Sequence, residues 1–108
     1  MSYKWPDKDP DELVDYSVDW SRFLGDDTIQ SATWFIHDAS GTKTQVSNAQ
    51  VVNGLQFIIG TLPTGSNNVA TVRFGLGTNN IKYKIVCRID TSNGNRYERS
   101  IFLTCKEK

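Results

Sequence analysis

Apolar and polar side chains alternate strictly along much of this chain, and this alternation constrains the fold more than any other feature. In the segment 14–20 the even-numbered residues are apolar and the odd-numbered residues are polar. A period of two is typical of a strand with one buried face. The same pattern predicts strands over 32–37, 55–59, 70–76, 81–89 and 96–105, with a weaker strand over 44–52.

Turn-forming residues separate these segments, and no window of ten residues shows the 3.6-residue apolar period of a helix. Glycine, asparagine, aspartate, serine and proline dominate such turns because they adopt the backbone angles that turns need. We expect turns at 25–27, 40–41, 53–54, 63–68, 77–80 and 92–94. About seven short strands at this spacing predict an all-β fold, an antiparallel β-sandwich of two sheets.

The last two predicted strands can be aligned residue by residue. A two-residue turn between them would put the apolar residues of the final strand on the outer face. A three-residue loop over 92–94, with Gly94 in the left-handed conformation, pairs Ile85 with Ile101 and keeps both inside. This register sets Cys87 opposite Arg99. The charged side chain of Arg99 then points inward, which indicates either a bulge or the open edge of the sandwich. It also holds Cys87 and Cys105 too far apart for a disulfide, so both thiols are expected to stay reduced.

The charges divide the chain unevenly although its net charge is zero. Residues 1–27 carry eight acidic and three basic side chains, whereas residues 73–108 carry three acidic and eight basic ones. Residues 1–12 contain two prolines and read as an extended acidic N-terminal arm before a sandwich domain over 13–108. Either the two ends lie side by side in the fold, or copies of the chain contact each other in a homo-oligomer.

Composition argues against several classes of function. Zero net charge lacks the electrostatic signature of a nucleic-acid binder. The polar start is unlike a signal peptide, and no apolar run approaches the ~20 residues of a membrane helix. We therefore expect synthesis in a cytosol, with no nucleic-acid and no membrane partner.

No catalytic, cofactor-binding or metal-binding residues are predicted. His37 is the single histidine and lies on the polar face of its strand, without a nucleophile elbow elsewhere in the chain. Asp7-x-Asp9-x-Asp11 starts like a calcium loop, but the positions that need Gly and Glu hold Glu12 and Val18. A solvated acidic arm is expected there, with a loose divalent-ion site as the alternative. Two cysteines and one histidine are too few for a structural zinc site.

Short motifs occur in both halves of the chain. The first half contains Lys8-Asp9-Pro10-Asp11-Glu12, Tyr16-x-Val18-Asp19-Trp20, Asp27-Thr28-Ile29 and Ser31-x-x-Trp34. The second half contains Tyr83-x-x-x-x-Arg88-Ile89-x-Thr91 and Gly94-x-Arg96-x-Glu98-Arg99-Ser100-x-x-Leu103. In these motifs the chain resembles a family of small tailed-phage proteins, described as phage tail or fibre–tail adaptor proteins with an immunoglobulin-like fold. The resemblance implies a non-enzymatic structural component of the virion tail, made in the host cytoplasm, whose partners are other tail or fibre proteins.

The outward-facing positions of the predicted strands and the distribution of charge identify candidate side chains for partner contacts. Trp5 lies in the predicted arm and is expected to be free for a partner. The outward positions supply three apolar and three basic side chains, namely Phe35, Ile58, Phe102, Lys82, Lys84 and Arg88. Aliphatic Ile58 suits a protein interface better than a sugar. The alternatives are a carbohydrate- or surface-binding module, which needs exposed aromatic side chains on one face, and an enzyme.

Overall fold

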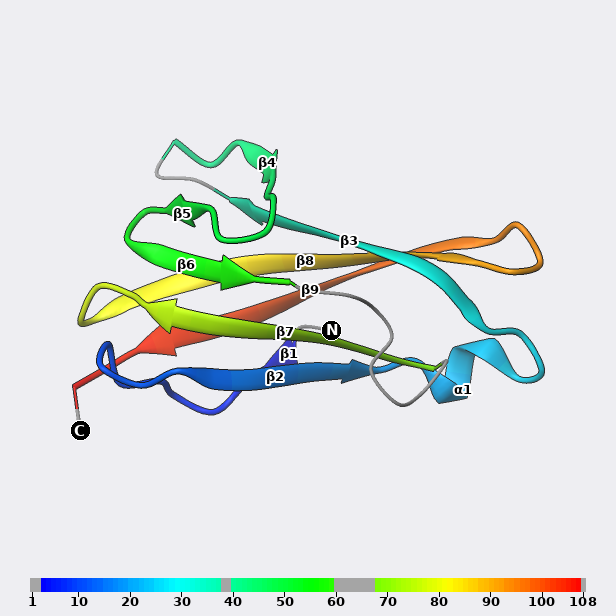
Figure 1. Cartoon of the computed structure of the whole chain (residues 1–108), viewed down its shortest axis with the longest axis horizontal. Coiled ribbons are helices and arrows are strands. Elements are labelled where there is room, and N and C mark those ends of the chain that lie inside the picture. The colour runs from blue at the N-terminus through cyan, green and yellow to red at the C-terminus, as the bar shows by residue number, and fades with distance from the viewer. Residues whose placement is uncertain (1–2, 38–39, 60–67, 108) are drawn as a thin grey trace.

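The computed structural model describes residues 3–37, 40–59 and 68–107 of the 108-residue chain. They form two β-sheets packed face to face, with one short helix at an end of the sandwich (Figure 1). Within these ranges no helix is long and apolar enough to cross a membrane. The elements in chain order are β1 (Tyr3–Lys4), β2 (Val14–Asp19), α1 (Ser21–Leu24), β3 (Ile29–His37), β4 (Lys43–Gln45), β5 (Val51–Val52), β6 (Leu55–Ile58), β7 (Val69–Leu76), β8 (Ile81–Thr91) and β9 (Arg96–Cys105).

The order of the strands agrees with the predicted sandwich. One sheet has the order β1-β9-β8-β3-β4 and the other has the order β2-β7-β6-β5. Immunoglobulin-like sandwiches place strands C, F and G in one sheet and strands B, E and D in the other. Here β3, β8 and β9 correspond to strands C, F and G, and β2, β7 and β6 correspond to strands B, E and D. Trp34 on β3 is fully buried, as is the tryptophan of strand C in antibody domains.

The described residues contain nine strands instead of about seven. The weak strand expected over 44–52 is two short strands in different sheets, because the chain crosses between the sheets after β4. At the start of the crossing the Val46 N–H donates to the Trp34 carbonyl, and at its end the Ala49 N–H donates to the Phe57 carbonyl (2.6 Å). Ala49 has a φ of 66°, which breaks the extended conformation.

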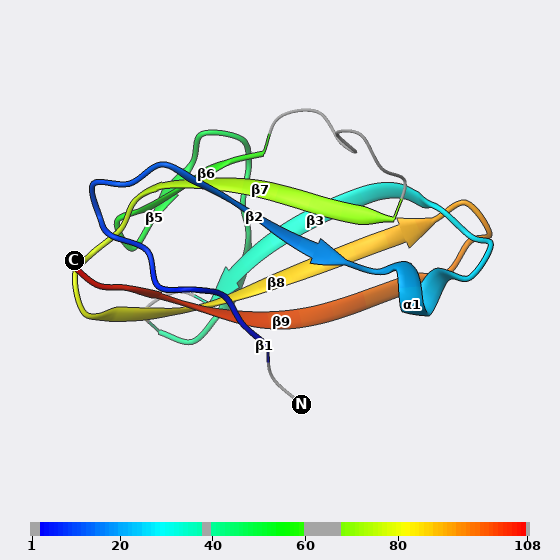
Figure 2. The same ribbon diagram turned by 90° about the horizontal axis from the view of Figure 1, so that it is seen from below.

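The N-terminal segment supplies the other extra strand, and its pairing is parallel rather than antiparallel. Tyr3 pairs with Ile101 and Lys4 with Phe102, so β1 lies beside β9 (Figure 2). The Trp5 N–H donates to the Phe102 carbonyl at 2.9 Å, which continues the contact. The two ends of the chain therefore lie side by side, as one explanation of the charge asymmetry predicted.

The hairpin of β8 and β9 has the predicted register. Ile85 pairs with Ile101 and Cys87 with Arg99, and Gly94 in the loop has a φ of 84°. The register runs through Arg99 without a shift, so this residue marks the open edge of the sandwich and not a bulge. Both cysteines are buried and free. The turn predicted over 63–68 lies outside the described residues except for Asn68.

One hydrophobic core fills the space between the sheets. Trp20 and Trp34 are almost completely buried, as the alternation predicts. Aromatic rings meet near the N-terminal segment, where the Trp5 ring lies 5.0 Å from Tyr16, 5.7 Å from Phe74 and 6.3 Å from Trp34 between ring centroids. The segment before β2 therefore contributes a large side chain to the core.

Candidate partner-binding surface

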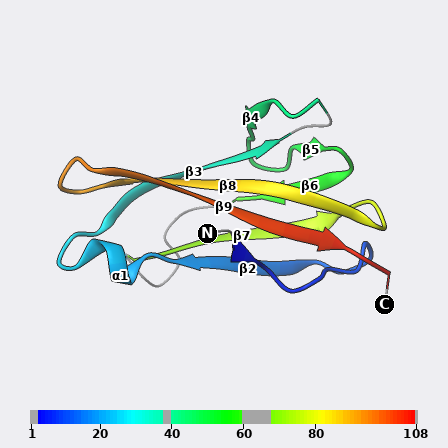
Figure 3. The same ribbon diagram turned by 180° about the vertical axis from the view of Figure 1, so that it is seen from behind.

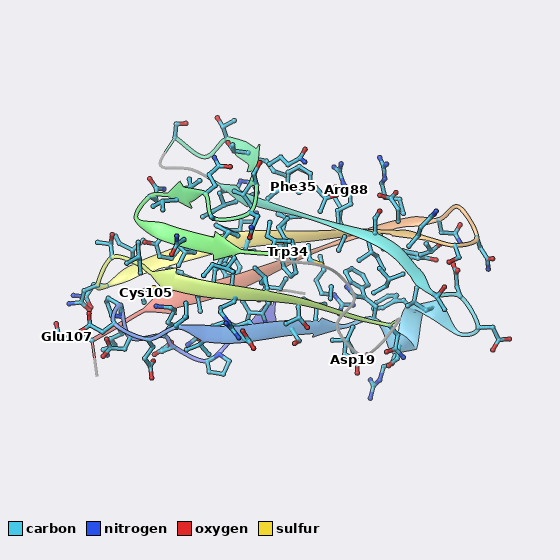
Figure 4. All side chains as sticks on the ribbon, viewed as in Figure 1. Asp19, Trp34, Phe35, Arg88, Cys105 and Glu107 are labelled. Atoms are coloured by element: carbon cyan, nitrogen blue, oxygen red, sulfur yellow. The ribbon has the colours of Figure 1, made fainter. Side chains whose placement is uncertain are left out.

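Basic side chains gather on the outer face of the five-stranded sheet. We call this surface the basic face and define it by Lys43, Lys82, Lys84 and Arg88 around Phe35 and Phe102. It lies on β4, β3, β8 and β9, and the strand pairing brings its residues from distant parts of the sequence to one side. Figure 4 shows Phe35 and Arg88 on the outer side of this sheet, with Trp34 on its inner side.

Phe35 belongs to the basic face, but it is not exposed as predicted. Only 7% of the residue is accessible, although it points away from the core. The Arg88 guanidinium lies 4.5 Å from the centre of the Phe35 ring, and the Lys43 ammonium lies 5.0 Å from it. On its other side Phe35 pairs with Val86, which is also buried. Cations over an aromatic ring are attracted to its electron-rich face, so the long basic side chains cover the apolar surface.

Phe102 has a similar environment nearer the other end of the sheet. It is half-buried, pairs with Lys84 across the strands, and has the Lys82 ammonium 4.5 Å from its ring centre. Lys82 is exposed and Lys84 is half-buried. The structure thus brings together five of the predicted residues, which are Phe35, Phe102, Lys82, Lys84 and Arg88.

One carboxylate organises the basic face. Glu98 accepts hydrogen bonds from Arg88 Nε (2.5 Å) and from Lys43 Nζ (3.1 Å), and Arg88 also pairs with it across the strands. Partial burial disfavours ionisation of Glu98, but the bonds from Arg88 and Lys43 outweigh it and lower the pKa of this carboxyl. Glu98 therefore stays ionised and holds the two cations over Phe35.

Two predicted residues lie elsewhere. Ile58 is half-buried on β6 and pairs with Arg73, on the outer face of the four-stranded sheet. Trp5 is only 9% exposed, and its indole N–H donates to the Ser17 carbonyl at 3.1 Å. The expectation that Trp5 is free for a partner is wrong, because pairing of β1 with β9 turns this ring into the core. The apolar residues predicted for partner contacts are therefore divided between two faces and the interior.

The candidate catalytic and metal residues have local roles. His37 donates from Nδ1 to the Gly41 carbonyl at 3.2 Å, beside the loop that follows β3. In the acidic segment the Asp11 N–H donates to Asp9 Oδ1, and the Asp9 N–H donates to Glu12 Oε1. Within the described residues no group of three histidine, cysteine or acidic side chains is placed to hold a metal ion.

Other large apolar residues lie on the surface and could not be predicted there. Leu13, Phe23 and Leu76 are more than half exposed although they are large and apolar. Leu76 follows the alternation of β7 and pairs with Leu55, but its φ of 57° departs from the extended conformation and its side chain is exposed. Phe23 lies on α1, which is too short for a helical period to reveal it. Leu13 directly precedes the alternating segment, and a single apolar residue at that position carries no signal of exposure.

The chain was compared with known proteins. A family described as podophage GP4 fiber-tail adaptor protein gp77 matches residues 8–104, which include β2 to β8 and nearly all of β9. No curated protein matches the chain significantly. The matched range contains the whole basic face. Because the match covers nearly the entire chain, the protein belongs to the podophage GP4 fiber-tail adaptor family, gp77.

Proposed function

We propose that the chain is a non-enzymatic structural adaptor that connects tail and fibre proteins in the virion of a tailed bacteriophage, after synthesis in the host cytoplasm. The observation that carries this proposal is the match to the fiber-tail adaptor family over residues 8–104. The rigid two-sheet sandwich supports it, since a connector must hold two partners in a fixed geometry. No nucleic-acid or membrane partner is part of the proposal.

The basic face is the contact surface that we assign to one of these partners. Its apolar area lies at Phe102, beneath Lys82, and at Phe35, beneath Arg88 and Lys43. Exposed ion pairs contribute only ~0.2–1 kcal/mol each, so displacement of the flexible lysines from Phe102 by an apolar partner group should supply more of the affinity. Ile58 is assigned to a separate contact on the opposite outer face. Trp5 is left out, because its ring lies in the core.

The carbohydrate-binding alternative stays a hypothesis. A sugar-binding face stacks rings on open aromatic surfaces. The faces of Phe35 and Phe102 instead carry the side chains of Arg88, Lys43 and Lys82. This arrangement favours a protein partner over a sugar.

Charge reversal on the basic face tests the proposal. Phage carrying the double variant Lys82→Glu and Lys84→Glu are expected to assemble particles that lack fibres, because the partner surface now meets repulsion instead of attraction. The measurement is the fraction of fibre-bearing particles in electron micrographs. In parallel, the purified variant should no longer retain the tail or fibre proteins that the wild-type chain retains from lysates of the same phage.

The matched control is Lys106→Glu, which changes an exposed lysine outside the basic face. Both variants should show the circular dichroism and urea midpoint of the wild-type chain, so that any loss of fibres reflects binding and not folding. Normal fibre attachment by a folded Lys82→Glu, Lys84→Glu variant would remove the basic face from the proposal. Normal particles from a phage that lacks the gene altogether would overturn the adaptor function itself.

A further inference from the structure

A groove runs along one long side of the sandwich, where the two sheets are not joined. β2 is the outermost strand of the four-stranded sheet, and β1 lies at the edge of the five-stranded sheet, as Figure 3 shows. Among the described residues, hollows of about 390 and 250 Å³ lie between β2 and the N-terminal segment, and a third of about 230 Å³ lies between the end of β2, α1 and Arg99 of β9. Trp5 and Ser17 line the first and second hollows, and Asp19 and Arg99 line the second and third. Because they share walls, we treat them as one feature, the side groove.

The side groove is acidic at one end. Asp7, Glu12 and Asp15 line the largest hollow, together with the rings of Trp5 and Tyr16. Oδ1 of Asp7 is buried and has no hydrogen-bond partner in the part of the chain that the structure describes. A buried acceptor of this kind is costly unless a donor reaches it. Aromatic rings beside carboxylates are also a favourable environment for a cation.

The opposite end of the side groove is basic. Lys4, Arg22 and Arg99 line the other two hollows, where Asp19 is the carboxylate. The Asp19 carboxylate accepts a hydrogen bond from the Ser21 N–H at 2.9 Å. The Arg99 guanidinium lies 4.8 Å from the Trp20 ring centre and 4.6 Å from that of Phe23. These contacts position Arg99 at the wall of the groove.

The backbone edge of β2 contributes little to recognition. The Ser17 carbonyl, which points out from this edge, already accepts the hydrogen bond of the Trp5 indole. A partner strand that paired at Ser17 would have to share this carbonyl with the indole N–H of Trp5. Side chains of a partner can enter the hollows without disturbing this bond, and the separated charges give the groove a direction.

We propose that the side groove binds an extended segment of a neighbouring protein, with a basic residue near one end and an acidic residue near the other. The basic residue occupies the hollow of Asp7 and Glu12, and the acidic residue lies against Lys4 and Arg22. The groove follows the six residues of β2, about 20 Å of extended chain, so the two charges stand about five residues apart. The proposal rests on the adaptor function stated above and adds a second contact surface to it.

Labelled peptides and the full chain test the inference by fluorescence anisotropy. The probe is acetyl-Glu-Thr-Val-Thr-Val-Lys-amide, and the matched controls carry Glu at both ends or Lys at both ends. The mixed peptide should bind at least about tenfold more tightly than either control, because each control places one like charge in the groove. Its affinity should fall steeply when the salt is raised from about 0.05 M to about 0.5 M.

Variants of the chain locate the binding. Lys4→Gln with Arg22→Gln removes two exposed cations, and Glu12→Gln keeps the oxygen that accepts the Asp9 N–H. Each variant is expected to lower the affinity for the mixed peptide by about three- to tenfold, whereas Lys82→Gln on the basic face should leave this affinity unchanged. Circular dichroism and the urea midpoint verify that the variants are folded.

Three outcomes would overturn the inference. The first is equal binding of all three peptides, which includes no binding at all. The second is unchanged affinity in the folded groove variants. The third is self-association of the chain in sedimentation experiments that Lys4→Gln with Arg22→Gln abolishes, because a second copy would then be the occupant. Any of these outcomes, with fibre loss retained in the Lys82→Glu, Lys84→Glu phage, removes the groove but leaves the adaptor function intact.

Discussion

Lys8 is a charged side chain that is completely buried between the two sheets. Its ammonium donates to the Leu76 carbonyl at 2.6 Å and to the Asp9 carbonyl at 2.8 Å. Its backbone donates to the Thr104 carbonyl and accepts from the Lys106 N–H. One residue thus joins the N-terminal segment, the end of β7 and the end of β9. Burial lowers the pKa of Lys8, although neighbouring acidic groups partly oppose this shift.

Replacement of Lys8 by methionine should destabilise the fold by about 1–3 kcal/mol. Methionine fills a similar volume but leaves the Leu76 and Asp9 carbonyls without their donor. The measurement is the free energy of unfolding from urea titration. Lys106→Met, at an exposed position, is the control and should change it by less than about 0.5 kcal/mol. Equal effects of the two changes would contradict the bridging role of Lys8.

The buried thiol of Cys87 makes the free energy of unfolding depend on pH in the alkaline range. Burial raises the pKa of this thiol to about 12 from an ordinary value of 9.0. Above pH 9 the unfolded chain has therefore lost a proton that the folded chain keeps, so this group makes stability fall as the pH rises toward 12. Cys87→Ala should remove about 1 kcal/mol per pH unit of that fall. Because Lys8, Tyr16 and Cys105 titrate in both proteins, the comparison of the two pH slopes isolates Cys87. Parallel slopes between pH 9 and 10.5 would refute the assignment.

At the scale of elements, the β8–β9 hairpin could be predicted to the residue. Only one register keeps Ile85 and Ile101 on the core side, and a glycine stands where the loop needs a left-handed residue. Two constraints of different origin, apolar pattern and backbone conformation, point to the same pairing. The register therefore followed from sequence although its partners are up to 24 residues apart.

Gly94→Ala tests this loop. Alanine at a φ of 84° is strained, and the substitution should cost about 1–2 kcal/mol in free energy of unfolding. A Cβ at this position meets no atom within 4 Å, so the cost is conformational and not steric. Gly94→Asn should cost clearly less, because asparagine tolerates the left-handed conformation. If both variants were as stable as wild type, the loop would not constrain the hairpin as described.

Other elements could not be derived from the sequence, for identifiable reasons. β1 has two residues, too few for alternation to appear, and its parallel partner is the last strand. The burial of Lys8 has no sequence signal, since lysine is almost never fully buried. The alternation along β3 correctly predicts that Phe35 points to the outer face. Its burial depends on Arg88 and Lys43, which reach it across neighbouring strands. The side groove arises from the approach of two sheet edges, which strand patterns do not specify.

At the scale of the whole molecule, the N-terminal segment and the sandwich share one core. Trp5 belongs to the same hydrophobic cluster as Trp34, Tyr16 and Phe74. A small domain with one continuous core unfolds as one cooperative unit. Removal of residues 1–12 is therefore a test of folding before it is a test of assembly, because the deletion takes away Trp5 and Lys8 together.

Trp5→Ala should lower the free energy of unfolding by about 3 kcal/mol, since a large ring leaves a cavity among Tyr16, Trp34 and Phe74. Near- and far-ultraviolet circular dichroism should still give coincident urea transitions. The control Val51→Ala, at a position 49% exposed, should shift the midpoint little. A Trp5→Ala protein with wild-type stability would mean that the segment is not part of the cooperative unit.

The pairing of β1 with β9 also sets the order in which the molecule can be completed on the ribosome. Tyr3 and Lys4 are synthesised before every other strand, yet Ile101 and Phe102, their partners, belong to the strand that is made last. A shorter nascent chain can neither complete the five-stranded sheet nor pair β1 with β9. β1 therefore stays unpaired until the rest of the sandwich has been synthesised. Its pairing with β9 joins the two ends of the chain, and contacts between residues so far apart in the sequence form slowly. Completion of the fold is consequently tied to emergence of β9 from the exit tunnel.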